Sequence, residues 1–248
     1  MVWYQEASQG EEESGQMNGI AIIATTYFPP GEPGRLRLKA ALETLGSWAE
    51  HLVGGIDLLC IADDGSEPAL HSRYVRAASE YSVVHGMAAV TTARRGVGAS
   101  LNAGLQCAWG RGYDVIGYFV DDWALTADLD LRDWAKVLTE HGSLGMIRLG
   151  PPHPFTSGAV ELFSAGWGLR LDRHGFAFGH RPALYHKRLF DAYGLFDEGC
   201  SALECERLYN EGVCADGAGP DIILALPHPW RHVDSVELSA VEPEGVLA

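Results

Sequence analysis

Val115-Ile-Gly-Tyr-Phe-Val-Asp-Asp-Trp123 is the most informative segment of the chain, because a run of apolar or small residues ends abruptly in two carboxylates. Such a run predicts a buried strand of a parallel sheet. Ligands of open α/β sheets bind at the carboxyl ends of the strands, so we predict a polar site at Asp121 and Asp122. Side chains alternate along a strand, so we expect only one aspartate to face a ligand directly. Alternatively, one of them caps the turn that follows.

The same kind of segment recurs on both sides of residues 115–123. Apolar runs predict further strands at 20–24, 56–62, 83–92 and 145–149. Between them, apolar residues at helical spacing predict helices near 38–52, 68–80, 98–108 and 131–138. Alternating helices and continuously apolar strands predict an α/β fold over residues 19–150, with a mainly parallel, doubly wound sheet flanked by helices.

The two ends of the chain have a different character. Residues 1–18 include an acidic run and lack apolar periodicity, so we predict a disordered N-terminal extension. After Pro151-Pro152 the strand and helix rhythm changes, and glycine, aromatic and histidine residues become frequent. We predict a hairpin across 172–175, short helices near 184–193 and 201–211, and a smaller C-terminal lobe over 151–248 that packs on the first half within the same domain.

Bulk properties exclude some classes of protein. The net charge of −15 disfavours a general affinity for nucleic acid or anionic membrane, so a nucleic-acid partner is not expected. No apolar run approaches the ~18–20 residues that span a bilayer, and no signal peptide is expected before the first strand. Five cysteines without a paired framework indicate reduced thiols and a cytoplasmic protein. A zinc site built from Cys200, Cys205, Cys214 and His228 is disfavoured because their spacing matches no usual ligand pattern.

Three consecutive predicted strands end in polar clusters, which are Thr25-Thr26-Tyr27, Asp63-Asp64-Gly65-Ser66 and Asp121-Asp122. The carboxyl ends of parallel strands share one edge of the sheet, so these clusters should converge on one crevice. Arg94 and Arg95 precede a predicted helix, and a helix N-terminus with arginines favours a diphosphate. Arg35 and Arg37 are interpreted as a solvated helix start. Acidic and anion-binding groups in one crevice predict a divalent cation, Mg²⁺ or Mn²⁺, between carboxylate and phosphate oxygens.

The ordered segments resemble the motifs of family 2 glycosyltransferases, which have the GT-A fold. The segments are Ala24-Thr-Thr-Tyr27, Ile61-Ala-Asp-Asp-Gly-Ser66, Arg95-Gly-Val-Gly-Ala-Ser-Leu-Asn-Ala-Gly104, Phe119-Val-Asp-Asp-Trp123, Phe190-Asp-Ala-Tyr-Gly-Leu-Phe-Asp-Glu198, Glu204, Arg207-Leu-Tyr-Asn-Glu-Gly212 and His232-Val-Asp-Ser235. The resemblance extends from residue 19 to about 236. It implies a nucleoside-diphosphate sugar as donor and an acceptor hydroxyl, without indicating which sugar, base or acceptor.

The resemblance also implies roles for individual residues. The nucleotide-sugar-binding residues would be Thr25, Tyr27, Asp64 and Asp121, with Asp64 accepting from a base N–H and Asp121 touching the ribose or sugar. Asp122 would bind the metal on the diphosphate, and His232 would complete the metal or diphosphate site. Val120 stands where the family often has another carboxylate.

The chemistry implied is displacement of a nucleoside diphosphate from the anomeric carbon, which needs a carboxylate to take the acceptor proton. In the family this base lies at the helix start after the Phe-Asp-Glu motif. The resemblance points to Glu204, then Glu206, then Asp197, although the usual Glu-Asp pair is replaced here by Glu204-Cys205-Glu206. One base on one face implies inversion, and residues 151–248 would form the acceptor and catalytic lobe. Alternatively, these glutamates lie on a solvated helix face.

There are three alternative functions. A Rossmann oxidoreductase would have a third glycine where Leu101 follows Gly96-Val-Gly98, and its fingerprint would follow the first strand. A nucleotidyltransferase would have a glycine-rich loop with Lys or Arg directly after the first strand, whereas residues 25–34 are rich in proline and lack lysine. A non-catalytic nucleotide-sugar-binding protein remains an alternative. Aromatic residues of the C-terminal half line a pocket or fill the core; they are Trp167, Phe176, Phe178, His180 and Tyr185.

Overall fold

A computed structural model describes residues 19–151, 158–171, 179–215, 219–227 and 229–233. The extension predicted for residues 1–18 and the hairpin predicted across 172–175 lie outside these ranges, as do Phe176, Phe178 and His228.

One nine-stranded sheet forms the centre of the fold, in the order β4-β3-β1-β5-β11-β8-β12-β10-β9. Its parallel half consists of β4 (Met87–Thr91), β3 (Leu58–Asp63), β1 (Ala21–Thr26) and β5 (Val115–Val120). The antiparallel strand β11 (Ala183–His186) joins this half to β8 (Leu144–Arg148), which pairs in parallel with β12 (Asp221–Leu226). A hairpin of β9 (Gly158–Phe163) and β10 (Gly166–Leu171) completes the sheet. The C-terminal half of the chain therefore continues the same sheet.

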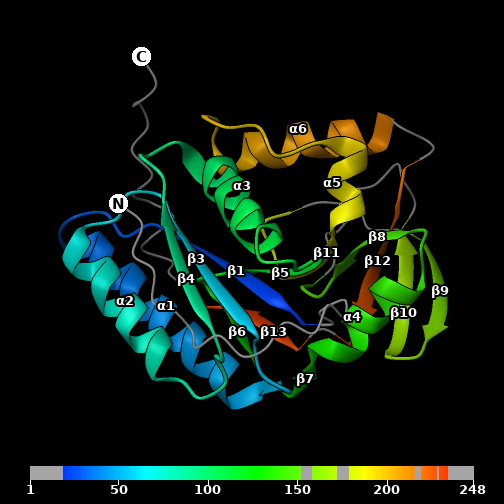
Figure 1. Ribbon diagram of the computed structural model, residues 1–248, viewed down its shortest axis with the longest axis horizontal. Coiled ribbons are helices and arrows are strands. Elements are labelled where there is room, and N and C mark those ends of the chain that lie inside the picture. The colour runs from blue at the N-terminus through cyan, green and yellow to red at the C-terminus, as the bar shows by residue number, and fades with distance from the viewer. Residues whose placement is uncertain (1–18, 152–157, 172–178, 216–218, 228, 234–248) are drawn as a thin grey trace.

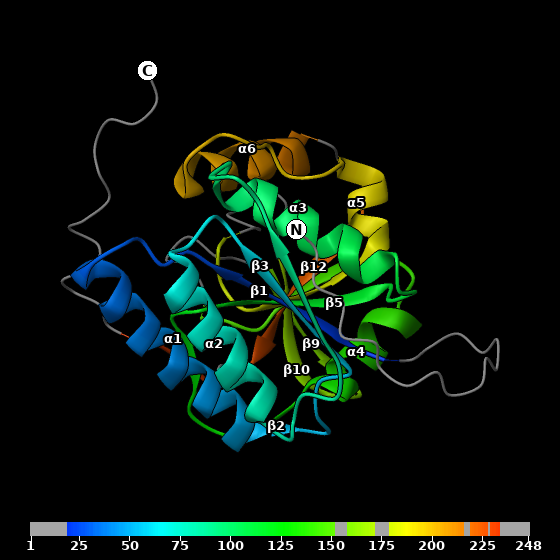
Figure 2. The ribbon, with the colours of Figure 1, turned by 60° about the vertical axis from the view of Figure 1, so that its left-hand side comes forward.

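Helices cover both faces of this sheet (Figures 1 and 2). One face packs against α1 (Glu32–His51), α2 (Pro68–Glu80) and α4 (Leu131–Glu140). The other packs against α3 (Gly96–Trp109), α5 (Lys187–Tyr193) and α6 (Ala202–Ala215). Two small sheets lie beside it, one of β2 (Leu52–Val53) with β7 (Leu129–Asp130), the other of β6 (Trp123–Leu125) with β13 (Trp230–His232). The predicted α/β fold class, a mainly parallel sheet flanked by helices, is confirmed.

The central strands owe their position to side chains that are apolar on both faces. All six residues of β1 are buried. Ile22 and Ala24 contribute to the core beneath α1 and α2, whereas Ala21 and Ile23 contribute to the core beneath α3. Because helices cover both faces of the sheet at β1, its side chains are buried whichever way they point, which explains why its sequence is continuously apolar.

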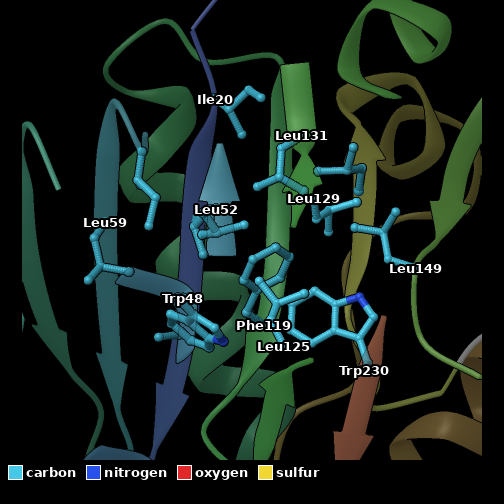
Figure 3. Close-up of a cluster of buried hydrophobic side chains, with 14 of the residues drawn as sticks. Ile20, Trp48, Leu52, Leu59, Phe119, Leu125, Leu129, Leu131, Leu149 and Trp230 are labelled. Carbon is cyan, nitrogen blue, oxygen red and sulfur yellow. The ribbon is translucent and has the colours of Figure 1, made fainter. Parts of the chain in front are cut away.

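Three aromatic side chains hold the end of β5 in place. The ring of Phe119 meets the Trp48 ring edge-on at 5.3 Å and the Trp230 ring at 4.9 Å between centroids. Figure 3 shows these rings together, brought from β5, α1 and β13. The indole Nε1 of Trp48 also donates to the carbonyl of Trp123, at 3.2 Å. The segment directly after β5 is therefore anchored to α1 and β13.

Two predicted elements differ from the structure. The strand expected at 83–92 begins only at Met87, because Tyr81 and Val84 form a turn whose carbonyl and N–H groups bond each other. The helix expected at 184–193 starts at Lys187, because residues 183–186 form β11 between β5 and β8. Pairing with two strands distant in sequence overrides the local helical pattern.

Within the described part of the chain, no helix is both long and apolar enough to cross a membrane.

We expect Phe119→Ala to lower the free energy of unfolding by about 3–5 kcal/mol, because it removes a fully buried ring between two tryptophans. Denaturant unfolding monitored by circular dichroism measures this change. The control is Leu203→Ala on α6, whose side chain is 72% exposed and whose removal should change stability by no more than about 0.5 kcal/mol. Equal effects of the two substitutions would contradict the assignment of Phe119 to the core.

Candidate functional site

A cleft of about 590 Å³ lies at the carboxyl ends of β1 and β5, beside the start of α3 and residues 200–202 at the start of α6. Of the residues to which the sequence assigned nucleotide-sugar or metal binding, six line it, namely Thr25, Tyr27, Asp64, Asp121, Asp122 and His232. The structure therefore brings together the three polar strand ends, as expected for parallel strands. Arg94, Arg95, Asp197, Glu204 and Glu206 do not line this cleft.

Two adjacent carboxylates at the end of β5 form the polar centre of the cleft. Oδ2 of Asp121 and Oδ1 of Asp122 are buried, and neither accepts a hydrogen bond from any described residue. Leaving a buried acceptor without a partner costs about 1–3 kcal/mol, and more when the group is charged. Buried polar groups of this kind mark places where a ligand or ion supplies the missing partner.

The environment of Asp121 favours its protonated form. Burial raises the pKa of Asp121 to about 7, the guanidinium of Arg37 opposes this rise, and the charge of Asp122 adds to it. Only 5% of Asp121 is exposed, so water does little to stabilise its charge. A positively charged ligand at this position would restore the ionised form.

His232 reaches the carboxylate pair from a different part of the chain. The pairing of β13 with β6 sets His232 opposite Trp123, and its Nε2 lies 3.2 Å from Oδ2 of Asp122. The backbone N–H of Val233 also donates to the carbonyl of Asp122, at 2.7 Å. These contacts place His232 beside Asp122 at the end of β5.

The donor set fits a divalent cation that is shared with a ligand. Among the described residues, no three His, Cys, Asp or Glu side chains are grouped to hold a metal on their own. Asp122 nevertheless offers a buried carboxylate oxygen without a partner, which is the type of donor that Mg²⁺ and Mn²⁺ prefer. Mg²⁺ is usually bound through one or two carboxylates, with phosphate oxygens and water completing its shell.

Asp64 is engaged in holding the start of α3. Its carboxylate accepts from the backbone N–H groups of Arg95 and Gly96, at 2.9 and 3.0 Å, and from the hydroxyl of Thr92 at 2.8 Å. Two of the amides predicted to receive a diphosphate are therefore already bonded. Gly96 has φ +85°, and a Cβ there would lie 2.8 Å from the carbonyl oxygen of Cys200, so the chain requires glycine at this point.

The arginines of the cleft differ from those expected. Arg94 stacks its guanidinium over the Tyr27 ring at 4.4 Å, and the Arg95 side chain pairs with Glu198. Arg37 and Arg181 line the cleft instead. The interpretation of Arg37 as a solvated helix residue is wrong, because α1 begins close to the end of β1 and directs this side chain toward the site. Arg181 belongs to no motif, and no local signal would have revealed it.

A hydrogen-bonded chain of three side chains also borders the cleft. Nε2 of His180 lies 3.1 Å from the carbonyl of Ala202, which can only accept, so Nε2 carries the proton. Nδ1 therefore accepts from the Tyr118 hydroxyl at 3.0 Å, and that hydroxyl accepts from Thr25 at 3.5 Å. Burial lowers the pKa of His180, which is consistent with a neutral ring. His180 was considered from the sequence only as a pocket or core aromatic, and the structure places it in the cleft.

The three candidate bases lie around α6 with different partners. Glu204 forms an ion pair with Arg207, whose hydrogen bond lowers the pKa of Glu204. Glu206 accepts from the backbone N–H of His180, at 2.5 Å, and so contacts a residue that lines the cleft. Asp197 is exposed on the loop before the helix. Ser201 and Ala202, immediately before and at the start of α6, do line the cleft.

The other aromatic candidates are distributed between core and surface. Tyr185 is fully buried and stacks on Tyr118 at 6.4 Å between centroids, so it belongs to the core beneath α5 and α6. Trp167 on β10 is 55% exposed and does not line the cleft.

No family model matches this chain, and no curated protein matches it. Similar solved structures include 4-diphosphocytidyl-2C-methyl-D-erythritol synthase of Anaerococcus prevotii, with 11% identity, a TM-score of 0.47, and coverage of 90% of this chain and 95% of that one. UDP-glucose pyrophosphorylase in complex with UDP-glucose shows 10% identity, a TM-score of 0.47, and coverage of 90% and 97%. The bifunctional glycosyltransferase WbbM in its apo form shows 11% identity, a TM-score of 0.40, and coverage of 75% and 34%. At TM-scores below 0.5 these likenesses carry no argument about function, which has to rest on the site.

We predict that the metal-free and nucleotide-free protein loses stability relative to Asp121→Asn as the pH rises. Folded Asp121, with its pKa raised to about 7, binds its proton more tightly than an unfolded Asp of pKa about 3.9. Its contribution is therefore complete below about pH 4 and is lost as the pH rises through about 7, by up to about 4 kcal/mol. Urea unfolding of both proteins at a series of pH values measures the difference in stability. A difference that does not change with pH would show that the pKa of Asp121 is not raised in the folded protein.

Proposed function

We propose that this protein is a glycosyltransferase that moves a sugar from a nucleoside-diphosphate sugar to an acceptor hydroxyl, with inversion and with the help of a divalent cation. The observation that carries the proposal is the pair of buried carboxylate oxygens without partners, on Asp121 and Asp122, in a cleft at the carboxyl end of a parallel sheet. In such sheets this edge is where nucleotides and similar ligands bind. The resemblance to family 2 motifs supports the same reading.

The nucleoside would bind at the end of β1. The Tyr27 ring lies under the guanidinium of Arg94 and within 5.9 Å of that of Arg37, so a flat, cation-bearing surface is available for a base. Thr25 is adjacent, although its hydroxyl already donates to Tyr118. Asp64, through its contacts with Arg95 and Gly96, orients the loop that closes this end of the cleft and would meet the base with its remaining acceptor capacity.

The diphosphate would bind between Asp122 and the cleft arginines. Asp122 and His232 would hold the cation, and a bound divalent cation neutralises negative charge on a leaving diphosphate. Arg37 and Arg181 both line the cleft, and guanidinium groups bind phosphate oxygens through paired N–H donors. We assign this role to Arg37 and Arg181 in place of the sequence candidates Arg94 and Arg95, because neither candidate lines the cleft and the Arg95 side chain is paired with Glu198.

The sugar would lie beside Asp121, with the acceptor entering past the start of α6. We propose Glu204 as the general base, because it lies in the first turn of α6, two residues after Ala202, which lines the cleft. The base must release Arg207 and turn toward the cleft to take the acceptor proton. His180, held neutral between Tyr118 and Ala202, would form the wall of this subsite.

Binding of donor and cation should be coupled through Asp122. We expect a nucleoside diphosphate to raise the melting temperature more with Mn²⁺ than without it, since ligands that bind only the folded state stabilise it. Asp122→Asn should abolish the manganese-dependent part of the shift. The matched control is Asp128→Asn, which removes an exposed carboxylate that pairs with His51. Differential scanning fluorimetry measures the shifts, and an undiminished manganese effect in Asp122→Asn would remove this residue from the site.

The base assignment can be separated from donor binding. Glu204→Gln should lower turnover about 10²–10⁴-fold while donor affinity is unchanged, as expected for loss of a general base. Glu211→Gln is the control, because Glu211 pairs with the same Arg207 from one turn further along α6. If both variants retain full turnover, Glu204 is not the base, and the same measurement on Glu206→Gln follows.

The reaction class is tested by the product that leaves. A screen of nucleoside-diphosphate sugars with Mn²⁺ should release nucleoside diphosphate, slowly by transfer to water and faster with the correct acceptor. Release of pyrophosphate from a nucleoside triphosphate and a sugar phosphate would instead show a nucleotidyltransferase. Nucleotide-sugar binding without release of either product would show a non-catalytic binding protein.

A further inference from the structure

Two cysteines far apart in sequence lie side by side where α3 packs on the sheet. Cys60 on β3 and Cys107 in the last turn of α3 have their Sγ atoms 3.6 Å apart. Cys60 is fully buried, whereas Cys107 is partly exposed. Both are free thiols. Helix α3, which carries Cys107, begins at the cleft residue Gly96. Strand β3, which carries Cys60, ends immediately before the cleft residue Asp64.

Two hydrogen-bond donors converge on the Cys107 sulfur. The thiol of Cys60 donates to it, and Nη1 of Arg111 donates to it at 3.0 Å and to the Cys107 carbonyl at 2.9 Å. These contacts favour the thiolate of Cys107 over its thiol. The hydrogen bond from Cys60 lowers the pKa of Cys107 to about 7, burial opposes the change, and the charge of Arg111 assists it. The pKa of Cys60 is correspondingly raised, so its sulfur keeps the proton.

We propose that Cys60 and Cys107 form an oxidation site at which a hydroperoxide converts the two thiols into an intramolecular disulfide. The partly exposed Cys107 is the attacking sulfur and the buried Cys60 is the resolving sulfur. This inference is independent of the proposed glycosyl transfer, because it rests on the sulfur geometry and on Arg111 alone.

The chemistry balances with hydrogen peroxide as the oxidant. The Cys107 thiolate attacks one peroxide oxygen, so that an S–O bond forms, the O–O bond breaks, and hydroxide leaves and takes up a proton as water. Cys60 then attacks the Cys107 sulfur, so that the S–S bond forms and the S–O bond breaks. The departing hydroxide takes the proton of Cys60, and the sum is two thiols and one peroxide giving one disulfide and two waters.

The geometry allows the second step with a small movement. A disulfide needs its sulfurs at about 2.05 Å, so the pair must approach by about 1.5 Å from the present separation of 3.6 Å. Of the remaining cysteines, Cys200 lies at the cleft and Cys205 is buried nearby on α6. The side chains of these two cysteines are hydrogen-bonded to each other, so they form a competing pair that the experiment has to distinguish from Cys60 and Cys107.

The test is titration of the reduced full-length protein with hydrogen peroxide at pH 7, followed by alkylation and peptide mapping without reductant. We expect the intact mass to fall by two hydrogen atoms, a cross-linked peptide containing Cys60 and Cys107, and full reversal by dithiothreitol. Cys107→Ser should lose this cross-link, while Cys200→Ser should retain it. A cross-link only between other cysteines, or oxygen addition to Cys107 without any cross-link, would overturn the proposal.

A second measurement isolates the contribution of Arg111. Arg111→Ala should slow peroxide consumption at Cys107 several-fold at pH 7 and shift the pH profile of alkylation upward. The control is Arg76→Ala, which removes an exposed arginine that pairs with Glu80 on α2. An unchanged profile in Arg111→Ala would overturn the role assigned to this arginine.

Discussion

The burial of two adjacent carboxylates at the end of β5 is the constraint on which the site depends. Asp121 and Asp122 each keep one buried oxygen without a partner among the described residues. That arrangement costs stability in the absence of a ligand, and burial raises the pKa of Asp121 accordingly. Packing of the core offsets this loss of stability, because β5 lies between β1 and β11 and its side chains are buried on both faces. A strand end of this kind is pre-organised for positive charge.

The same core decides where the distant parts of the site lie. Phe119 packs between Trp48 and Trp230, so the strand end, α1 and β13 share one set of contacts. Through α1 this cluster positions Arg37, and through β13 it positions His232 against Asp122. Folding of the core therefore also brings together the residues of the proposed cation site, although these residues are far apart in the sequence.

Much of this arrangement can be predicted from the sequence, because it follows from the parallel direction of the strands. Continuously apolar runs predict parallel strands, and parallel strands place Thr25, Asp64 and Asp122 at one edge. The remainder depends on tertiary contacts that leave no local pattern. Residues 183–186 form β11 because β5 and β8 leave a place between them. Arg181 and His180 reach the cleft only because that strand is inserted there. The hydrogen bonds from the backbone N–H groups of Arg95 and Gly96 to Asp64 likewise have no local sequence signal, because they join the end of β3 to the start of α3.

In the proposed complex, Asp122 and a diphosphate share one divalent cation in the cleft. An anomalous-scattering map from crystals grown with Mn²⁺ and a nucleoside diphosphate tests it most directly. We expect one manganese peak within bonding distance of an Asp122 carboxylate oxygen and of diphosphate oxygens, with the base near Tyr27. A nucleotide bound away from this cleft, or manganese without contact to Asp122, would contradict it.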